Sequence, residues 1–300
     1  MEFKKCSVLG VTFGEGLTEG MTGAAKRDGQ DLGPATDVKE VELAAIKDKV
    51  VRSMTSTINN RYFREDKLTL IAPELPRRLV DHDDPLRPHL IDFFRALAIC
   101  HSVLSDTPEP EKPYILDYKA ESPDEAALVA ADRDIGFPFV SGNTSRIDIE
   151  VLGKSERWPP LRVLEFNSSR KRMSVIVRDP ENRIVLFGKC ADSVIYERLA
   201  QDYDEGLKQA TLKDLETFAN GGLRTLCVAQ RYLGEQELED WAKRYDAASA
   251  AVDDREAEIE RACEQTPSSS LARRLSKTSC KRVCQTLSQR STRPESSCGS

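Results

Sequence analysis

The chain has 300 residues, a formal net charge of −6 and 31% charged residues, so it is long enough for one large domain or two ordinary ones. The acidic balance argues against a general nucleic-acid binder, which would carry a basic face. No run approaches the roughly 18 apolar residues of a bilayer span, and the N-terminus lacks the long apolar core of a secretory signal. We therefore expect a soluble, cytosolic chain without direct membrane insertion.

The cysteines and histidines are scattered along the chain rather than grouped. The eight cysteines include no paired CxxC units, and the three histidines are not spaced as ligands beside them. Structural zinc sites use closely spaced Cys and His ligands. We therefore expect no metal site, and reduced thiols rather than disulfides.

The first elements are a Gly-rich start and a helix. Residues 1–36 are rich in glycine after a short apolar start, and we predict that they form a mobile N-terminal segment. From Thr36 onward the pattern changes, because apolar residues recur near one helical face with Lys and Glu between them. This spacing predicts a helix whose apolar positions are Val38, Val41, Ala45 and Val51.

A proline-rich stretch separates this helix from the next one. The four prolines within 73–88 predict a loop, and Pro88 stands where a helix can begin. Apolar residues follow it at helical spacing as far as His101. On that face we expect His101 to be a core histidine with satisfied hydrogen bonds rather than a ligand.

Another helix start is encoded by Ser122-Pro123-Asp124-Glu125. Ser122 can cap the helix, Pro123 suits its first turn, and Glu125 completes a capping box. The local sequence therefore predicts a helix from this point, whatever further role the motif has.

The following region has the alternation of β-strands. Residues 161–166 and 173–178 alternate apolar and polar side chains, a turn signal follows at 179–182, and 183–187 returns as a partner strand. This predicts an antiparallel hairpin. Farther along we expect short helices at 192–199 and 211–219, a strand at 223–230 and a long charged helix over 235–264.

The last residues have another composition. From about Gln265 the chain is rich in Ser, Thr, Arg and Cys, with hardly any aliphatic periodicity. Such a composition predicts a disordered tail over 265–300. The organised domain should therefore span 37–264.

Four segments together resemble the nucleotide-binding domain of lipid flippases, the phospholipid-translocating P-type ATPases. Their order and separations match that family, and the resemblance runs from Met1 to about residue 262. The segments are SPDEAALV (122–129), LEFNSSRKRMSVIV (164–177), GKCADSVIYERL (188–199) and GGLRTLCVAQ (221–230). The resemblance implies an α+β fold, a largely antiparallel twisted sheet flanked by helices, with ATP bound at one end of the sheet.

The resemblance also implies a set of site residues. Phe166 matches the aromatic residue that stacks on adenine, Lys189 the lysine at the base of the pocket, and Arg224 the arginine that reaches toward phosphate. Base stacking and cation–phosphate pairing are the interactions that a nucleotide needs. Four further positions match an acidic residue near the adenine edge and lesser contacts, namely Glu125, then Ser168, Lys171 and Thr225.

Simpler interpretations of these residues exist. Without the family, Phe166 would be a core residue, and the cluster Arg170-Lys171-Arg172 a solvated turn. The sequence also departs from the family pattern, in which Gly-Ala-Asp follows the lysine. Here Cys190 stands in place of that glycine. We expect its Cβ and sulfur to crowd the base, so that this chain binds ATP more weakly than a Cys190→Gly variant.

The resemblance finally implies what the chain cannot do alone. The DKTGT motif with the phosphate-accepting aspartate does not occur in the sequence, and neither does a TGD-type motif. Without that nucleophile the covalent route is closed. We expect no catalytic residue here, ATP binding without turnover, Mg²⁺ arriving with the nucleotide, and phosphorylation, actuator and membrane domains as partners in a pump at the cytosolic face of a membrane.

Two alternatives to a pump domain remain open, a stand-alone non-catalytic nucleotide-binding module and a pseudogene product. The tail bears on them. Codons can be chosen for residues 272–299 such that a one-base shift of the reading frame encodes another amino-acid sequence. That sequence resembles the segment following the nucleotide domain in these pumps. We therefore hypothesise that residues 265–300 are out of frame, which resequencing of the locus would test.

Overall fold

The computed structural model describes residues 1–16, 33–109, 111–168, 170–197, 204–251, 255–264 and 282–288. Its centre is a seven-stranded sheet with the order β2-β1-β12-β11-β10-β9-β8, in which all neighbouring strands run antiparallel. The strands are β1 (Glu2–Val8), β2 (Val11–Phe13), β8 (Pro160–Asn167), β9 (Arg172–Arg178), β10 (Ile184–Cys190), β11 (Arg224–Leu233) and β12 (Arg282–Ser288).

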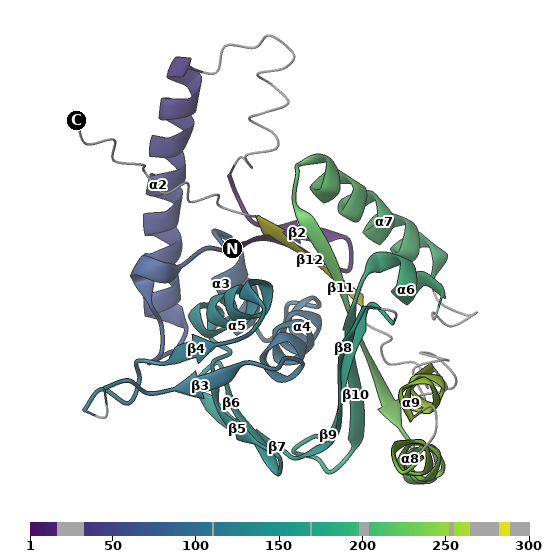
Figure 1. Cartoon of the computed structure of the whole chain (residues 1–300). Helices are drawn as coiled ribbons and strands as arrows, with labels where there is room; N and C mark the ends of the chain where they lie inside the picture. The colour runs from purple at the N-terminus through teal and green to yellow at the C-terminus, as the bar shows by residue number, and fades with distance from the viewer. Residues whose placement is uncertain are drawn as a thin grey trace, which may run out of the picture.

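Two smaller sheets and a set of helices surround the large sheet (Figure 1). The small sheets pair β3 (Leu104–Asp106) with β4 (Asp117–Lys119), and β5 (Phe139–Asn143) with β6 (Arg146–Val151) and β7 (Lys154–Trp158). The helices are α2 (Gly33–Thr57), the 3-10 turn η1 (Glu65–Lys67), α3 (Leu75–Val80), α4 (Arg87–Ile99), α5 (Pro123–Ile135), α6 (Asp192–Glu197), α7 (Glu205–Asn220), α8 (Glu235–Ser249) and α9 (Arg255–Glu264).

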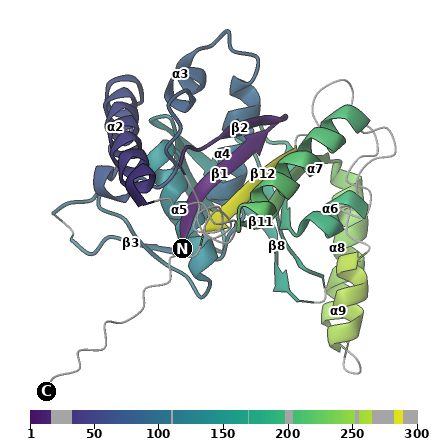
Figure 2. The ribbon, with the colours of Figure 1, turned by 90° about the horizontal axis from the view of Figure 1, so that it is seen from above.

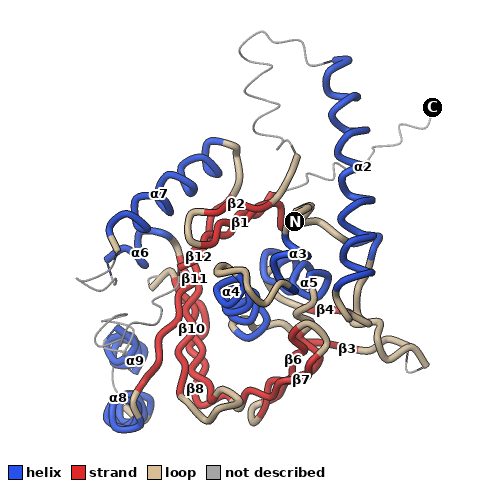
Figure 3. The backbone as a smooth tube through the Cα atoms, turned by 180° about the vertical axis from the view of Figure 1, so that it is seen from behind, coloured by secondary structure: helices blue, strands red, loops and turns tan. Residues whose placement is uncertain are grey.

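Helices cover both faces of the large sheet. Figure 3 shows α4 and α5 enclosed between it and the β5–β7 sheet, with α6, α7, α8 and α9 on its other side. Alternation along β9 and β10 divides the core accordingly. Val175 and Phe187 belong to the cluster that contains α4, whereas Ile176 and Leu186 belong to the cluster under α6, α7 and α8. The antiparallel α+β fold that the sequence predicts is confirmed.

The predicted hairpin is the pair β9–β10. Asp179 fixes its turn, because one carboxylate oxygen accepts hydrogen bonds from the backbone N–H of Glu181 (2.9 Å) and of Arg183 (2.8 Å). Asn182 takes a positive φ of 64° there, a conformation that Asn tolerates well. The register continues without a shift to the end of β10, which carries the alternation of the hairpin as far as residue 190.

The helix at 122–135 starts as predicted, but the capping box does not form. α5 begins at Pro123 and ends at Gly136, whose φ of 115° suits a glycine. Within the described residues the Ser122 side chain makes no capping hydrogen bond. The Glu125 carboxylate bonds instead to residues of other elements, because tertiary partners compete with the helix terminus for the same group.

Both chain ends differ from their predictions. β1 and β2 place residues 2–13 in the sheet, where Phe3 and Cys6 are fully buried, so the predicted mobile segment is wrong for these residues. In the predicted disordered tail, β12 is a strand between β1 and β11, whose open edges pair with it (Figure 2). Residues 17–32, 265–281 and 289–300 lie outside the described residues.

Two helix predictions also need correction. The proline-rich stretch 73–88 contains α3, because Pro76 lies in the first turn of that helix, where no backbone donor is lost. The single helix expected over 235–264 is split into α8 and α9. The indole of Trp241 donates a hydrogen bond of 3.0 Å to the carbonyl of Ala262, which ties the two helices together. Among the described residues, no helix has the length and apolarity for crossing a bilayer.

Candidate functional site

A cleft of about 1070 Å³ lies where the N-terminus of α5, the β3–β4 pair and the ends of β8, β10 and β11 meet. Most of the residues that the sequence predicts for a nucleotide site line this cleft. They are Glu125, Phe166, Lys171, Lys189, Arg224 and Thr225. In the described part of the chain, Ser168 is the predicted residue that does not line it.

Phe166 presents an exposed aromatic ring in the cleft. It is 65% exposed although it belongs to a strand, and β8 is an edge strand of the sheet whose register with β9 shifts between Leu164 and Asn167. Leu104 on β3 is also in the lining and is 67% exposed. Large apolar side chains exposed together in a concave site indicate a surface for an apolar or planar ligand group. The interpretation of Phe166 as a core residue is therefore wrong.

Lys189 lies deep in the same cleft and is ion-paired. It is 8% exposed, and its Nζ lies 2.5 Å from Oε1 of Glu125. The other oxygen of Glu125 accepts hydrogen bonds from the backbone N–H and the hydroxyl of Ser102, at 3.2 and 2.5 Å. Burial raises the pKa of Glu125, but the Lys189 ammonium and Ser102 outweigh this effect and lower the pKa overall. The carboxylate and the ammonium therefore form a buried pair at the base of the cleft.

Arg224 is an exposed cation in the lining of the cleft. Its Nη1 lies 2.5 Å from Oδ2 of Asp124, with side-chain exposures of 59% and 23%. An exposed ion pair of this kind contributes about 0–1 kcal/mol, so a stronger anion can displace the carboxylate. The cleft thus contains the buried Lys189 and the exposed Arg224, and Lys119 and Lys171 also line it.

His101 supports the wall of the cleft. Nε2 lies 2.9 Å from the carbonyl of Ala98, and the backbone N–H of Val103 donates to Nδ1 at 3.1 Å. The ring is therefore neutral, with its proton on Nε2. Burial, and secondarily the nearby Lys189, lowers the pKa of His101 to about 4. The predicted satisfied hydrogen bonds are present on a half-buried ring, and they hold the loop that presents Ser102.

The basic cluster after Phe166 is not a solvated turn. Arg170 and Arg172 are both buried, and Nη2 of Arg170 donates to the carbonyl of Glu165 at 2.6 Å. Lys171 alone of the three lines the cleft, from a backbone with a φ of 49°. The carbonyl of Lys171 accepts the N–H of Ala191 at 3.2 Å, which joins this turn to the end of β10.

Cys190 does not line the cleft, which corrects the expectation that its sulfur would crowd the base. It follows Lys189 on β10, and successive side chains of a strand point to opposite faces. Cys190 is buried in the cluster under α6, α7 and α8. The predicted gain in ATP affinity of the Cys190→Gly variant therefore loses its steric reason.

Several lining residues were missed by the sequence analysis. Asp124 adjoins the predicted site residue Glu125 in the motif at 122–125, so its place near the cleft could have been predicted from the sequence. Ser102 and Leu104 carried no local signal, because only the fold brings β3 to this cleft. The missed lining residues include Ser102, Leu104, Lys119, Glu121, Asp124 and Leu226.

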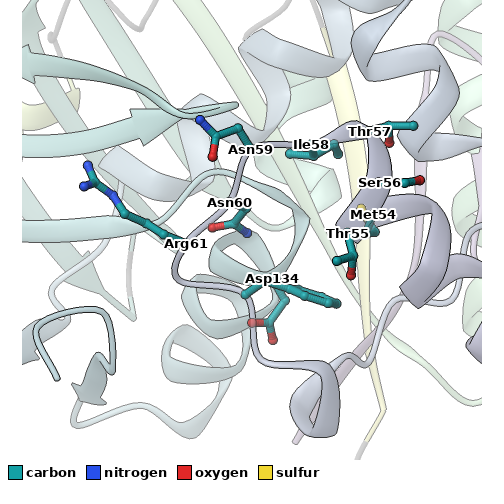
Figure 4. Close-up of a pocket in the computed structure, with 10 residues that line it drawn as sticks. Met54, Thr55, Ser56, Thr57, Ile58, Asn59, Asn60, Arg61 and Asp134 are labelled. Atoms are coloured by element: carbon teal, nitrogen blue, oxygen red, sulfur yellow. The ribbon is translucent and has the colours of Figure 1, made fainter.

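A second cavity, of about 430 Å³, lies at the C-terminal end of α2 (Figure 4). It is lined by residues 54–61, Phe63 and Asp134, and shares none of its described lining with the nucleotide cleft. Its polar groups are occupied within the fold. Asn60 donates to the carbonyl of Arg133 at 2.6 Å, and Arg61 pairs with Glu150. This cavity therefore offers few groups to a ligand.

The described residues contain no group of three or more His, Cys, Asp or Glu side chains that could hold a metal ion. In the cleft, the carboxylates of Asp124 and Glu125 are paired with Arg224 and Lys189. Divalent cations such as Mg²⁺ need oxygen ligands that are available for coordination. Glu121 and Glu165 also line the cleft, beside the basic residues Lys119, Lys171, Lys189 and Arg224.

Comparison with known proteins defines the class to which this fold and site belong. The family described as P-type ATPase, cytoplasmic domain N, matches residues 89–263, more than half of the chain, and the chain belongs to that family. Its similar relatives are phospholipid-transporting ATPases. The chain is 41% identical over 261 residues to DNF1 of Chaetomium thermophilum, and 37% identical over 264 residues to ATPase IC of Xenopus tropicalis.

These matches cover most of this chain but little of the relatives. The alignment with Chaetomium DNF1 covers 87% of this chain and 17% of that protein, and the alignment with the Xenopus protein covers 88% and 18%. A third relative, dnf2 of Schizosaccharomyces pombe, is 41% identical, with 87% and 18% covered. The chain thus spans less than a fifth of the length of these relatives and corresponds to their N-domain portion.

Proposed function

We propose that this chain binds ATP in the cleft at the N-terminus of α5. The observation that carries this proposal is the convergence of Phe166, Lys189 and Arg224 on one cleft of about 1070 Å³. An exposed ring offers stacking for the base, and two cations offer charge-assisted bonds to phosphate. Membership of the P-type ATPase N-domain family supports the same ligand.

Each residue has a distinct part in this proposal. The Phe166 ring stacks on the adenine, while Leu104 and Leu226 shield the base from water. Lys189 remains beside Glu125 and contributes a fixed positive charge at the base of the cleft. Arg224 exchanges Asp124 for phosphate oxygens. Mg²⁺ arrives on the phosphates and neutralises part of their charge when bound. Lys171 and Thr225 add polar contacts at the rim of the cleft. Ser168, which does not line the cleft, adds a further polar contact to the nucleotide.

The proposal extends to a whole pump. The relatives are named as phospholipid-transporting ATPases, so we infer that this domain presents ATP to a phosphorylation domain whose reaction drives phospholipid translocation, with actuator and membrane domains as the other partners. No DKTGT motif occurs in these 300 residues. The chain alone therefore binds ATP without turning it over. In the complete protein, this domain lies at the cytosolic face of the membrane.

Titration calorimetry of the whole chain with ATP tests the site. Stacking on an aromatic ring contributes about 1–3 kcal/mol, so Phe166→Ala is expected to raise the Kd about 5- to 150-fold. Lys189→Ala is expected to raise it about tenfold or more, because a charged donor is lost and Glu125 is left uncompensated. Val163→Ala is the matched control, since Val163 is exposed on the same strand outside the described lining. Unchanged affinity in both site variants rejects the proposal.

A second variant examines the exchange at Arg224. Asp124→Asn keeps the shape of the side chain but removes the carboxylate that competes with phosphate. We expect ATP affinity to rise by at most about fivefold, because an exposed ion pair contributes about 0–1 kcal/mol, and the gain to shrink in high salt. Asp240→Asn on α8 makes the same charge change on the opposite side of the sheet. Weaker ATP binding by Asp124→Asn would mean that this carboxylate assists the nucleotide instead.

A further inference from the structure

Two cysteines stand directly opposite each other in the strand pair beneath the cleft. In the antiparallel register of β10 and β11, Cys190 is the partner of Cys227. Both side chains belong to the same core cluster, under α6, α7 and α8, and are 5% and 2% exposed. Neither thiol is in a disulfide in this structure. The fold thus brings together two thiols that are 37 positions apart in the sequence.

Their placement fits the geometry of a disulfide. Directly opposed residues of an antiparallel pair have Cα atoms about 4.5 or 5.5 Å apart, depending on whether the pair is hydrogen-bonded. Both separations lie within the range of about 4.4–6.8 Å that disulfides use. The other buried thiols lack such a partner in the described pairings, because Cys6 is opposite Phe13 and Gln285, and Cys100 lies just beyond α4.

The pair is also joined to the nucleotide cleft through its neighbours in sequence. Lys189 and Ala191 flank Cys190, and Thr225 and Leu226 precede Cys227, and all four of these neighbours line the cleft. A bond between the two sulfurs fixes the spacing of β10 and β11 at the level where these side chains project. A change in that spacing alters the distance between Lys189 and the cleft residues of β11.

We propose that Cys190 and Cys227 form a reversible dithiol–disulfide pair that controls the geometry of the cleft. Formation of the bond depends only on the two thiols, whereas its effect on ATP rests on the proposed function. Cytosolic disulfides are commonly transient and redox-sensing, which is the role assigned here.

The oxidant that we assign is a peroxide. One thiolate attacks a peroxide oxygen, the O–O bond breaks, and a sulfenic acid and one water result. The second thiolate attacks the sulfenic sulfur, the S–S bond forms, and the second water leaves. The balance is two thiols and one hydrogen peroxide giving one disulfide and two waters. A dithiol reductant reverses the step by thiol–disulfide exchange. Because both thiols are buried, the reaction requires local opening and is slow.

Peptide mapping without reduction tests the bond. The whole chain is treated with hydrogen peroxide, digested and analysed by mass spectrometry, and we expect a peptide pair joined through Cys190 and Cys227 that dithiothreitol separates. Cys100→Ser is expected to keep this product, and Cys190→Ser to lose it. Cys227 also stands opposite Cys284 in the register of β12. A Cys227–Cys284 product, or recovery of both peptides unlinked, overturns the proposal.

Two further measurements test the consequence for the fold and for the cleft. Closing a loop of this length is expected to raise the midpoint of thermal unfolding by about 4–16 °C, a readout that does not involve ATP. The Kd for ATP of the oxidised chain is expected to differ at least about threefold from the Kd of the reduced chain. The Kd of the Cys190→Ser variant should not change on treatment with peroxide. A linked chain with an unchanged midpoint and unchanged Kd overturns the control of the cleft. A linked, stabilised chain that binds no ATP in either state contradicts the proposed function and leaves the disulfide standing.

Discussion

Replacing Asp134 by alanine is expected to lower the free energy of unfolding by about 3–5 kcal/mol, because it leaves a buried guanidinium without its counter-ion. Asp134 is fully buried on α5, and its carboxylate accepts hydrogen bonds from Nε of Arg133 at 2.8 Å and from Nη2 at 3.0 Å. It also accepts the backbone N–H of Arg64 at 3.1 Å. Among the described residues, the carbonyl of Leu116, at 3.4 Å, and the Tyr118 ring remain beside the guanidinium.

Urea unfolding followed by tryptophan fluorescence measures this loss. Asp240→Ala, on the exposed surface of α8, is the control and should stay within about 0.5 kcal/mol of the parent chain. Replacing Arg133 and Asp134 together by Met and Leu should recover most of the loss, since apolar residues can replace a buried ion pair without cost. A loss below about 1 kcal/mol for Asp134→Ala would show that water reaches Arg133.

The segments that could be predicted from the sequence are those whose pattern is local. The β9–β10 hairpin has its own turn residues and alternation, and α5 has Pro123 at its start and Gly136 at its end. The convergence of Phe166, Lys189 and Arg224 followed from motifs matched to a family rather than from local physics. Their role as nucleotide ligands stays a prediction that the experiments above address.

The misses have tertiary causes. β1 contributes buried residues although it contains two lysines and a glycine-rich stretch follows it, because its pairing partners include β12, about 280 residues away. The Ser122 capping box fails because Lys189 and Ser102 provide stronger partners for Glu125. No local pattern encodes either competition, so sequence periodicity alone could not reveal them.

One error was avoidable. The predicted partner strand ends at Phe187, whereas the register of β9 with β10 continues to residue 190. Extending the same period of two places Lys189 on the face of Phe187 and Cys190 on the opposite face. The position of Cys190 on the face away from the cleft could therefore be predicted from the sequence.

Replacing Asp132 by alanine is expected to have the opposite effect to replacing Asp134. Asp132→Ala should raise the free energy of unfolding at pH 7 by about 1–3 kcal/mol. Asp132 is fully buried, and neither carboxylate oxygen has a hydrogen-bond partner among the described residues. Burial raises its pKa well above the ordinary value. The nearby thiol of Cys6 is likewise kept neutral, because burial and then Asp132 raise its pKa.

The pH dependence separates this explanation from a simple packing effect. Since the pKa of Asp132 is higher in the folded chain than in the unfolded chain, where it is about 3.9, the folded state holds more protons between the two values. Stability therefore falls as the pH rises from about 4 through the folded-state pKa, and the advantage of Asp132→Ala should grow over that range. Asp132→Asn is the matched control, because it removes the titration but keeps a buried polar group. The stability of Asp132→Asn relative to the parent chain should rise with pH in parallel with that of Asp132→Ala, but from a lower starting value. An Asp132→Ala chain that is less stable than the parent at every pH would show that the carboxylate contributes to the fold rather than opposing it.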